Sequence, residues 1–235
     1  MRKLLLAAAA LISLGVASQA QAAPELSARI FQDGVFVPGT STTSSSGSLI
    51  VTGSSANFSV VTALAFGFPQ VAQPALDVQT TSISSTGNFA TAHTVSFEVT
   101  QTGLTSASAG APLAALASSF TANFLINGAA ITNVTLTSYA DANNTAFGRD
   151  QLLSSVSYST SPTGSSPAIV ANPTLNNSLF SETVVITATF TAAGALLNAS
   201  SQIVAVPEPA SLALFGIGLL GMGLVRQRKT AKPLA

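Results

Sequence analysis

The chain has 235 residues, of which 7% are charged, and it contains one histidine and neither cysteine nor tryptophan. A soluble cytosolic domain usually carries about 25% charged residues, so this composition favours a secreted, surface or membrane-associated protein. The absence of cysteine excludes disulfides, a thiolate nucleophile and cysteine-ligated zinc. Between residues 24 and 206, two basic residues stand against seven acidic ones, a net charge of −5, which excludes electrostatic attraction to nucleic acid or anionic lipid.

The first 22 residues have the three parts of a secretory signal peptide. Arg2 and Lys3 form a positive start, residues 4–16 form an apolar core, and Ala20-Gln21-Ala22 fits the small-residue cleavage rule. We therefore expect a signal helix over residues 1–22, Sec-dependent export, and cleavage after Ala22 with Ala20 and Ala22 as the recognised residues. A retained N-terminal anchor is the alternative, which the short apolar core disfavours.

Alternation of apolar and polar residues with period two predicts half-buried strands in the body of the chain. Each such stretch has one apolar face and one face rich in Thr and Ser, as expected where one side meets solvent. The stretches are 58–68 (with Phe58, Val60, Thr62, Leu64, Phe66 and Phe68 as one stripe), 94–100, 120–126 and 184–191.

Turn residues divide these stretches. Asp33-Gly34 and Asn127-Gly128 each lie between apolar runs and predict two-residue hairpins. Clusters of Ser, Thr and Gly at 40–48, 102–110 and 159–166 predict loops, and 40–48 is alternatively a flexible segment. Residues 113–120 hint at a short helix. Together these signals predict one extracellular domain over residues 23–205, an antiparallel β-sandwich of the jelly-roll or immunoglobulin-like kind.

Few residues of the body suggest catalysis or metal binding. His93 forms a Ser-His-Asp arrangement only if Asp77 or Asp141 comes near it, and with so many serines a partner is no evidence, so we expect a structural or rim histidine. The segment with Asp141, Asn143 and Asp150 lacks the Gly and Glu of an EF-hand, which leaves a loose calcium loop or a polar Asx turn. Acids and aromatic sugar platforms are scarce, so we expect no enzyme, no metal and no cofactor.

The C-terminal region, residues 206–230, begins with Val206-Pro207-Glu208-Pro209. Residues 210–225 carry no charge and predict a short transmembrane helix, and a basic tail over 226–232 follows. The positive-inside rule keeps this tail, including Arg226, Arg228 and Lys229, in the cytoplasm as a stop signal. Glycines inside the helix spell G-x-G-x-x-G, but no acidic residue follows them, so a dinucleotide site is not expected.

A Pro-Glu-Pro triplet, an apolar helix and a basic stop, in this order, resemble the PEP-CTERM sorting signal of Gram-negative bacteria. The resemblance implies that an exosortase recognises Pro207, Glu208 and Pro209, removes the helix after a transient stay in the inner membrane, and passes the body to the cell surface or the outside. Such systems accompany exopolysaccharide and biofilm formation. Proline fixes φ and disfavours helix in the preceding residue, so the triplet stays extended for an enzyme to grip.

We therefore expect an exported cell-surface or extracellular-matrix protein with a structural or adhesive role in exopolysaccharide. One alternative is a secreted hydrolase or carbohydrate-binding protein, and another is an unsorted, tail-anchored periplasmic protein. The partners that this implies are the exosortase, the Sec machinery, the inner membrane and exopolysaccharide, without nucleic acid.

Overall fold

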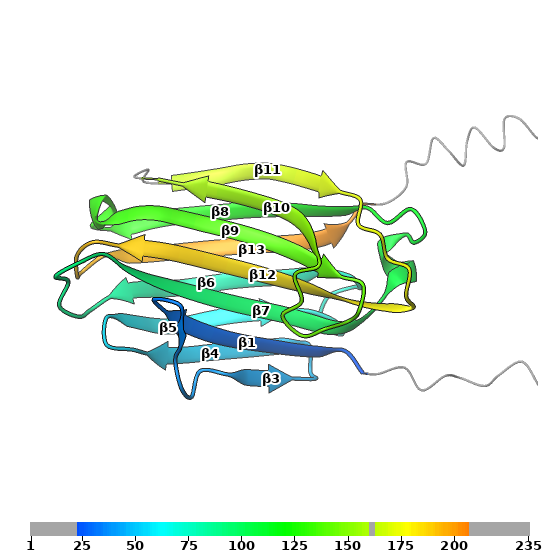
Figure 1. Ribbon diagram of the computed structural model, residues 1–235, viewed down its shortest axis with the longest axis horizontal. Coiled ribbons are helices and arrows are strands. Elements are labelled where there is room, and N and C mark those ends of the chain that lie inside the picture. The colour runs from blue at the N-terminus through cyan, green and yellow to red at the C-terminus, as the bar shows by residue number, and fades with distance from the viewer. Residues whose placement is uncertain (1–22, 160–162, 207–235) are drawn as a thin grey trace, which may run out of the picture.

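The computed structural model describes residues 23–159 and 163–206, which form two antiparallel β-sheets packed face to face (Figure 1). The antiparallel β-sandwich predicted from the sequence is confirmed. The predicted signal helix over 1–22 and transmembrane helix over 210–225 lie outside the described residues. So do Ala20, Ala22, the Pro-Glu-Pro triplet and the basic tail.

The first sheet has seven strands. Its order is β10 (Gln151–Tyr158), β9 (Ile131–Asp141), β12 (Leu179–Phe190), β7 (His93–Thr105), β1 (Glu25–Gln32) and β2 (Val35–Phe36), with β3 (Thr42–Ser44) also paired to β1.

The second sheet has six strands, in the order β11 (Thr163–Ala171), β8 (Leu116–Ile126), β13 (Leu196–Ala205), β6 (Leu76–Ser85), β5 (Phe58–Phe66) and β4 (Ser48–Ser54). Two short 3-10 turns, Ser106–Ala109 and Gly128–Ala130, precede β8 and β9.

Strands β6 to β13 follow the order of a jelly roll. One sheet contains β6-β13-β8-β11 and the other β7-β12-β9-β10, so paired strands wrap around the core as two Greek keys. The sequence left open a jelly-roll or an immunoglobulin-like topology, and the structure has the jelly roll. Strands β1 to β5 widen both sheets on one side.

The core lies between the sheets, where the inward faces of the strands meet. The predicted stripes of 94–100, 120–126 and 184–191 supply much of it, except that Ile126 is exposed at the end of its strand. The largest fully buried side chains include five phenylalanines, Phe58, Phe97, Phe120, Phe180 and Phe190. Burial of apolar surface of this kind is the main term that stabilises the sandwich.

The two predicted hairpins have different outcomes. Asp33 and Gly34 both have positive φ, 51° and 79°, and join β1 to β2 with Gln32 opposite Val35, so this prediction is confirmed. The Asn127-Gly128 prediction is wrong, because β8 and β9 belong to different sheets. Asn127 does adopt positive φ, but the 3-10 turn after it carries the chain across the core, and each strand pairs within its own sheet.

Further predictions are corrected. Residues 113–120 form no helix, since β8 starts at Leu116 with a period of two. The stripe over 58–68 breaks, because register shifts after Val60 turn Ala65 inward and leave Leu64 and Phe66 half-buried. The loops at 102–110 and 159–166 are shorter than expected, as β7 runs to Thr105 and β11 begins at Thr163. Within 40–48, Thr42–Ser44 pairs with β1.

Candidate functional site

The outer face of the six-stranded sheet carries an ordered set of polar side chains at its centre. Along β6, β8 and β13, every second residue points into the core, as the buried Val78, Ala122 and Ala199 do. The residues between them therefore point outward. Strand register aligns these outward residues in two rows that cross the three strands, Ser119–Gln202–Asp77 and Thr121–Ser200–Gln79.

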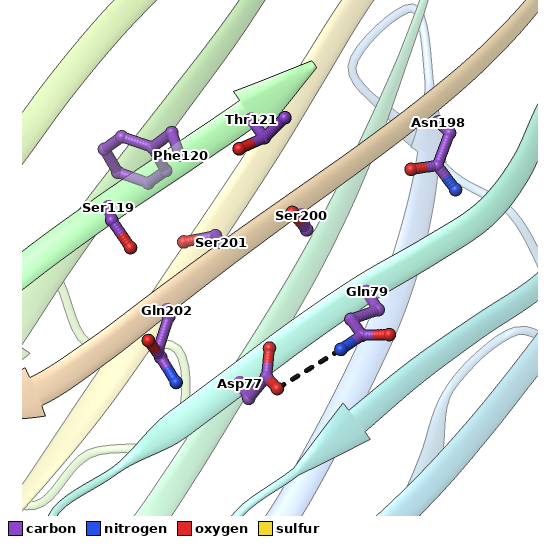
Figure 2. Close-up of a pocket in the computed structure, with 9 residues that line it drawn as sticks. All are labelled: Asp77, Gln79, Ser119, Phe120, Thr121, Asn198, Ser200, Ser201 and Gln202. Atoms are coloured by element: carbon purple, nitrogen blue, oxygen red, sulfur yellow. Dashed lines mark hydrogen bonds between the residues drawn. The ribbon is translucent and has the colours of Figure 1, made fainter. Parts of the chain in front are cut away.

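These rows line a groove of about 430 Å³, which we call the polar groove (Figure 2). The outward residues of β8 and of the middle of β13 are serine and threonine, and because their side chains are short, the centre of this face is a depression. Longer amide side chains stand around it, with Gln79 and Gln202 both exposed. Its lining residues are Asp77, Gln79, Ser119, Phe120, Thr121, Asn198, Ser200, Ser201 and Gln202.

Apolar side chains border the polar groove on the β5 side. Strand pairing sets Phe66 opposite Asp77 and Leu64 opposite Gln79, and both apolar residues are half-buried. The polar groove thus has hydroxyl and amide groups along its floor and an aromatic residue at its edge. Amide and hydroxyl groups both donate and accept hydrogen bonds, so this arrangement suits a ligand rich in hydroxyl groups.

Asp77 is the one acidic residue among the described residues that line the polar groove. Burial raises the pKa of its carboxyl, and the hydrogen bond that Gln79 Nε2 donates to Oδ2 at 3.3 Å opposes part of that rise. No basic side chain lines the polar groove in the part of the chain that the structure describes. A polyanion would therefore meet Asp77 without a compensating cation.

The two arginines of the body are engaged on the opposite sheet. Arg29 Nε lies 2.7 Å from Glu98 Oε2, and Arg149 forms a second ion pair with the other oxygen of Glu98. The guanidinium of Arg29 also stacks on Phe147, 3.9 Å from the ring centre. Through these contacts the β9–β10 connection, residues 142–150, straps across the outer face of the seven-stranded sheet. Both arginines are therefore engaged in holding this strap against the sheet.

His93 lies at the rim of the sandwich, beside the β1–β2 hairpin. Its Nδ1 is 2.8 Å from Asp33 Oδ2, and its ring meets the edge of Phe89. Burial acts to raise the pKa of Asp33, but hydrogen bonds from Thr94, His93 and Gln32 lower it overall. The acid beside His93 is thus Asp33, not Asp77 or Asp141, and a structural role for this histidine stays a prediction.

The segment that begins at Asp141 forms a polar turn, which is one of the two possibilities that the sequence left open for it. Asp141 Oδ1 accepts a hydrogen bond from the backbone N–H of Asn143 at 2.7 Å, which is an Asx turn. Gly148 passes so close to Asp141 that an added Cβ would overlap its carboxylate. Within residues 23–159 and 163–206, no three His, Asp or Glu side chains gather as a metal site.

Sequence reasoning missed the polar groove, although its signal is present. In residues 76–79 and 197–203, polar side chains alternate with buried residues, but in the second stretch the inward Ala199 and Ser201 weaken the contrast. No helix in the described part of the chain is long and apolar enough to cross a membrane.

The last two described residues carry the start of a sorting signal. A family model described as the PEP-CTERM protein-sorting motif matches residues 205–229. The chain carries a PEP-CTERM motif. The resemblance seen in the sequence is confirmed, and the match places Pro207, Glu208 and Pro209 inside the motif. The motif begins at Ala205, the final residue of β13, so no linker separates the sandwich from the PEP-CTERM region.

No curated protein sequence matches the chain. Among solved structures, TmCBM61 in complex with β-1,4-galactotriose is 12% identical, with 68% of this chain and 90% of that chain covered and a TM-score of 0.32. The enzymatically active domain of tailspike protein 4 from bacteriophage CBA120 is 9% identical, with 68% and 20% covered and a TM-score of 0.32. The CBM22-1 xylan-binding domain of Xyn10C from Paenibacillus barcinonensis is 14% identical, with 69% and 84% covered and a TM-score of 0.29. Similarity at these TM-scores does not extend to a site or a ligand.

Proposed function

We propose that this protein is exported, processed by an exosortase at Pro207-Glu208-Pro209, and delivered to the cell surface or extracellular matrix. The PEP-CTERM motif supports the processing step. The apolar residues 4–16 and the small residues before position 23 support Sec export. The positive tail after residue 225 supports a transient stay in the inner membrane with the body outside.

At the surface, the body binds neutral polysaccharide of the matrix through the polar groove and so has an adhesive role. The observation that carries this proposal is the alignment of two rows of outward polar side chains across β8, β13 and β6. A sugar chain presents hydroxyl groups that donate and accept, as the serine, threonine and amide groups of the polar groove do. Phe66 at the edge adds apolar area for a sugar face.

Binding without catalysis is part of the same proposal. Glycoside hydrolysis by the usual mechanism needs two carboxyl groups on opposite sides of the bond. The polar groove supplies Asp77, and the buried Glu98 is held between two arginines on the other sheet. A secreted hydrolase remains the alternative if purified protein releases reducing ends from matrix polysaccharide.

Affinity electrophoresis through gels that contain a polysaccharide tests this function. We expect dextran, a neutral chain, to retard the protein and alginate, an acidic chain, to leave its mobility unchanged. Gln79→Ala and Gln202→Ala each remove amide hydrogen bonds worth about 1 kcal/mol, or about fivefold in affinity. The matched control is Gln70→Ala, an exposed glutamine that lies outside the polar groove.

If all three variants were retarded equally, the polar groove would not be the polysaccharide-binding site. Retardation by alginate in place of dextran would contradict the preference for neutral chains. A plain tail-anchored periplasmic protein, the third possibility from the sequence, would keep its C-terminal segment.

A further inference from the structure

The PEP-CTERM region leaves the sandwich from a fixed point. Ala205 pairs with Leu116 of β8, and the backbone N–H of Val206 donates to the carbonyl of Ala115 at 2.9 Å. The chain is therefore held in the sheet up to the residue before Pro207. Only residues 207–209 lie between this point and the expected span, which starts at residue 210.

Such a short connection limits how far the body can stand from the bilayer. A fully extended chain advances at most about 3.6 Å per residue, so the four steps from Val206 to Ala210 cover at most about 14 Å. The headgroup region on one side of a bilayer is roughly 5–8 Å thick. While the span is in place, the end of the sandwich that holds Val206 must lie at the bilayer surface.

Leu113 projects from this same end. It belongs to the connection between β7 and β8, two residues before Ala115, and 76% of its surface is exposed. It borders a shallow groove of about 320 Å³ that it shares with Pro112, Ala114 and the segment 172–174. None of these residues is charged, so no ion would need to lose its hydration on contact with lipid.

We propose that, before processing, this end of the sandwich rests on the periplasmic face of the inner membrane with Leu113 inserted at the boundary of headgroups and acyl chains. This inference rests on the proposed sorting function, because it needs the span over residues 210–225. The partner is the zwitterionic lipid surface, since the body carries a net charge of −5 and the groove beside Leu113 is lined by no charged side chain. The contact fixes the Pro-Glu-Pro triplet at the bilayer surface, where an integral membrane enzyme can reach it.

The start of β1 lies at this same end of the sandwich. Glu25 pairs with Thr102 near the end of β7, so the first strand begins at the end of the sandwich from which β13 leaves (Figure 1). Strands β6, β8 and β13 then rise from the membrane, and the polar groove on their outer face stays open to the periplasm.

The natural absence of cysteine allows a direct test. Leu113→Cys in the full chain is labelled with an environment-sensitive fluorophore and reconstituted into phosphatidylcholine vesicles. The matched control is Leu125→Cys, an exposed leucine at the other end of β8, about 30 Å away along the strand. We expect a blue shift and quenching by spin-labelled lipid for the label at 113, and neither for the label at 125.

Co-sedimentation with the vesicles separates the outcomes. If the chain sediments with lipid but the label at 113 reports water, the inference is overturned while the membrane anchor stands. If the chain does not sediment with lipid, both the anchor and the inference are overturned. If the label changes only when exosortase is added, the enzyme and not lipid contacts Leu113, which also overturns the inference. Dextran retardation of the same variants reports on the polar groove separately.

Discussion

Glu182 makes the stability of this protein depend on pH in a way that can be measured. It lies in β12 with Gln101 and Ala140 opposite it, and its surface is fully buried. Neither of its carboxyl oxygens accepts a hydrogen bond from the described part of the chain. Burial therefore raises the pKa of Glu182 well above its ordinary value.

The direction of the effect follows from proton binding. An unfolded glutamate ionises near pH 4.3, whereas folded Glu182 keeps its proton to higher pH. Between these two pKa values the unfolded state binds fewer protons, so the free energy of unfolding falls as pH rises. The slope of this fall approaches about 1.4 kcal/mol per pH unit. Below the unfolded pKa both states hold the proton and the effect disappears.

Glu182→Gln removes this titration while keeping the shape of the side chain. Urea unfolding of the wild type and the variant, at several pH values from about 4 to 7, measures the difference between them. We expect the variant to gain up to about 1.4 kcal/mol over the wild type for each pH unit between the unfolded pKa and the raised folded pKa. Glu25→Gln, at an exposed position in β1, controls for the loss of one carboxyl.

A difference between wild type and Glu182→Gln that stays constant with pH would refute this reasoning. It would mean that Glu182 titrates alike in both states, and so has a partner in the folded protein. A difference of opposite sign would mean that the folded state favours the ionised carboxylate.

Two further predictions concern contacts inside and outside the core. Ser118 and Ser138 bond to each other across the two sheets at 2.8 Å and are fully buried. Changing either serine to alanine should lower the free energy of unfolding by about 1–3 kcal/mol, because the other hydroxyl loses its partner. In a double-mutant cycle measured by urea unfolding, the double variant should lose less than the sum of the two single variants. Strict additivity would contradict the pairing. Gly148→Ala should displace Asp141 and lower stability by about 1–3 kcal/mol, because its Cβ would overlap that carboxylate. An unchanged melting temperature would show that the strap can move to accept the added Cβ without loss of stability.

The sequence predicted this fold wherever one signal dominated. Alternation over 94–100 and 184–191 located two neighbouring strands, because their inward sides carry large apolar residues such as Phe97 and Ile186. Strand β13 escaped notice, since Ser201 and Ala199 on its inward side blur the contrast between its two faces. Asn127-Gly128 set the local reversal of the chain correctly, but a turn does not decide which sheet the next strand joins.

The candidate site was out of reach of sequence reasoning for a related reason. Asp77, Thr121 and Ser200 come from strands far apart in the chain, and only strand register brings them into adjacent rows. Each residue alone is an ordinary polar residue on a wet strand face. The sorting signal, by contrast, is a continuous stretch whose parts act in sequence order, so the amino-acid sequence alone is enough to identify it.

The mass and location of the mature protein test the central claim most directly. We predict that protein from native cells ends near Pro207-Glu208-Pro209 and is found at the surface or outside, while a strain lacking exosortase keeps the C-terminal segment in its membrane fraction. If protein from both strains retains Arg226, Arg228 and Lys229 and stays in the membrane, the segment is an anchor and the sorting account is contradicted.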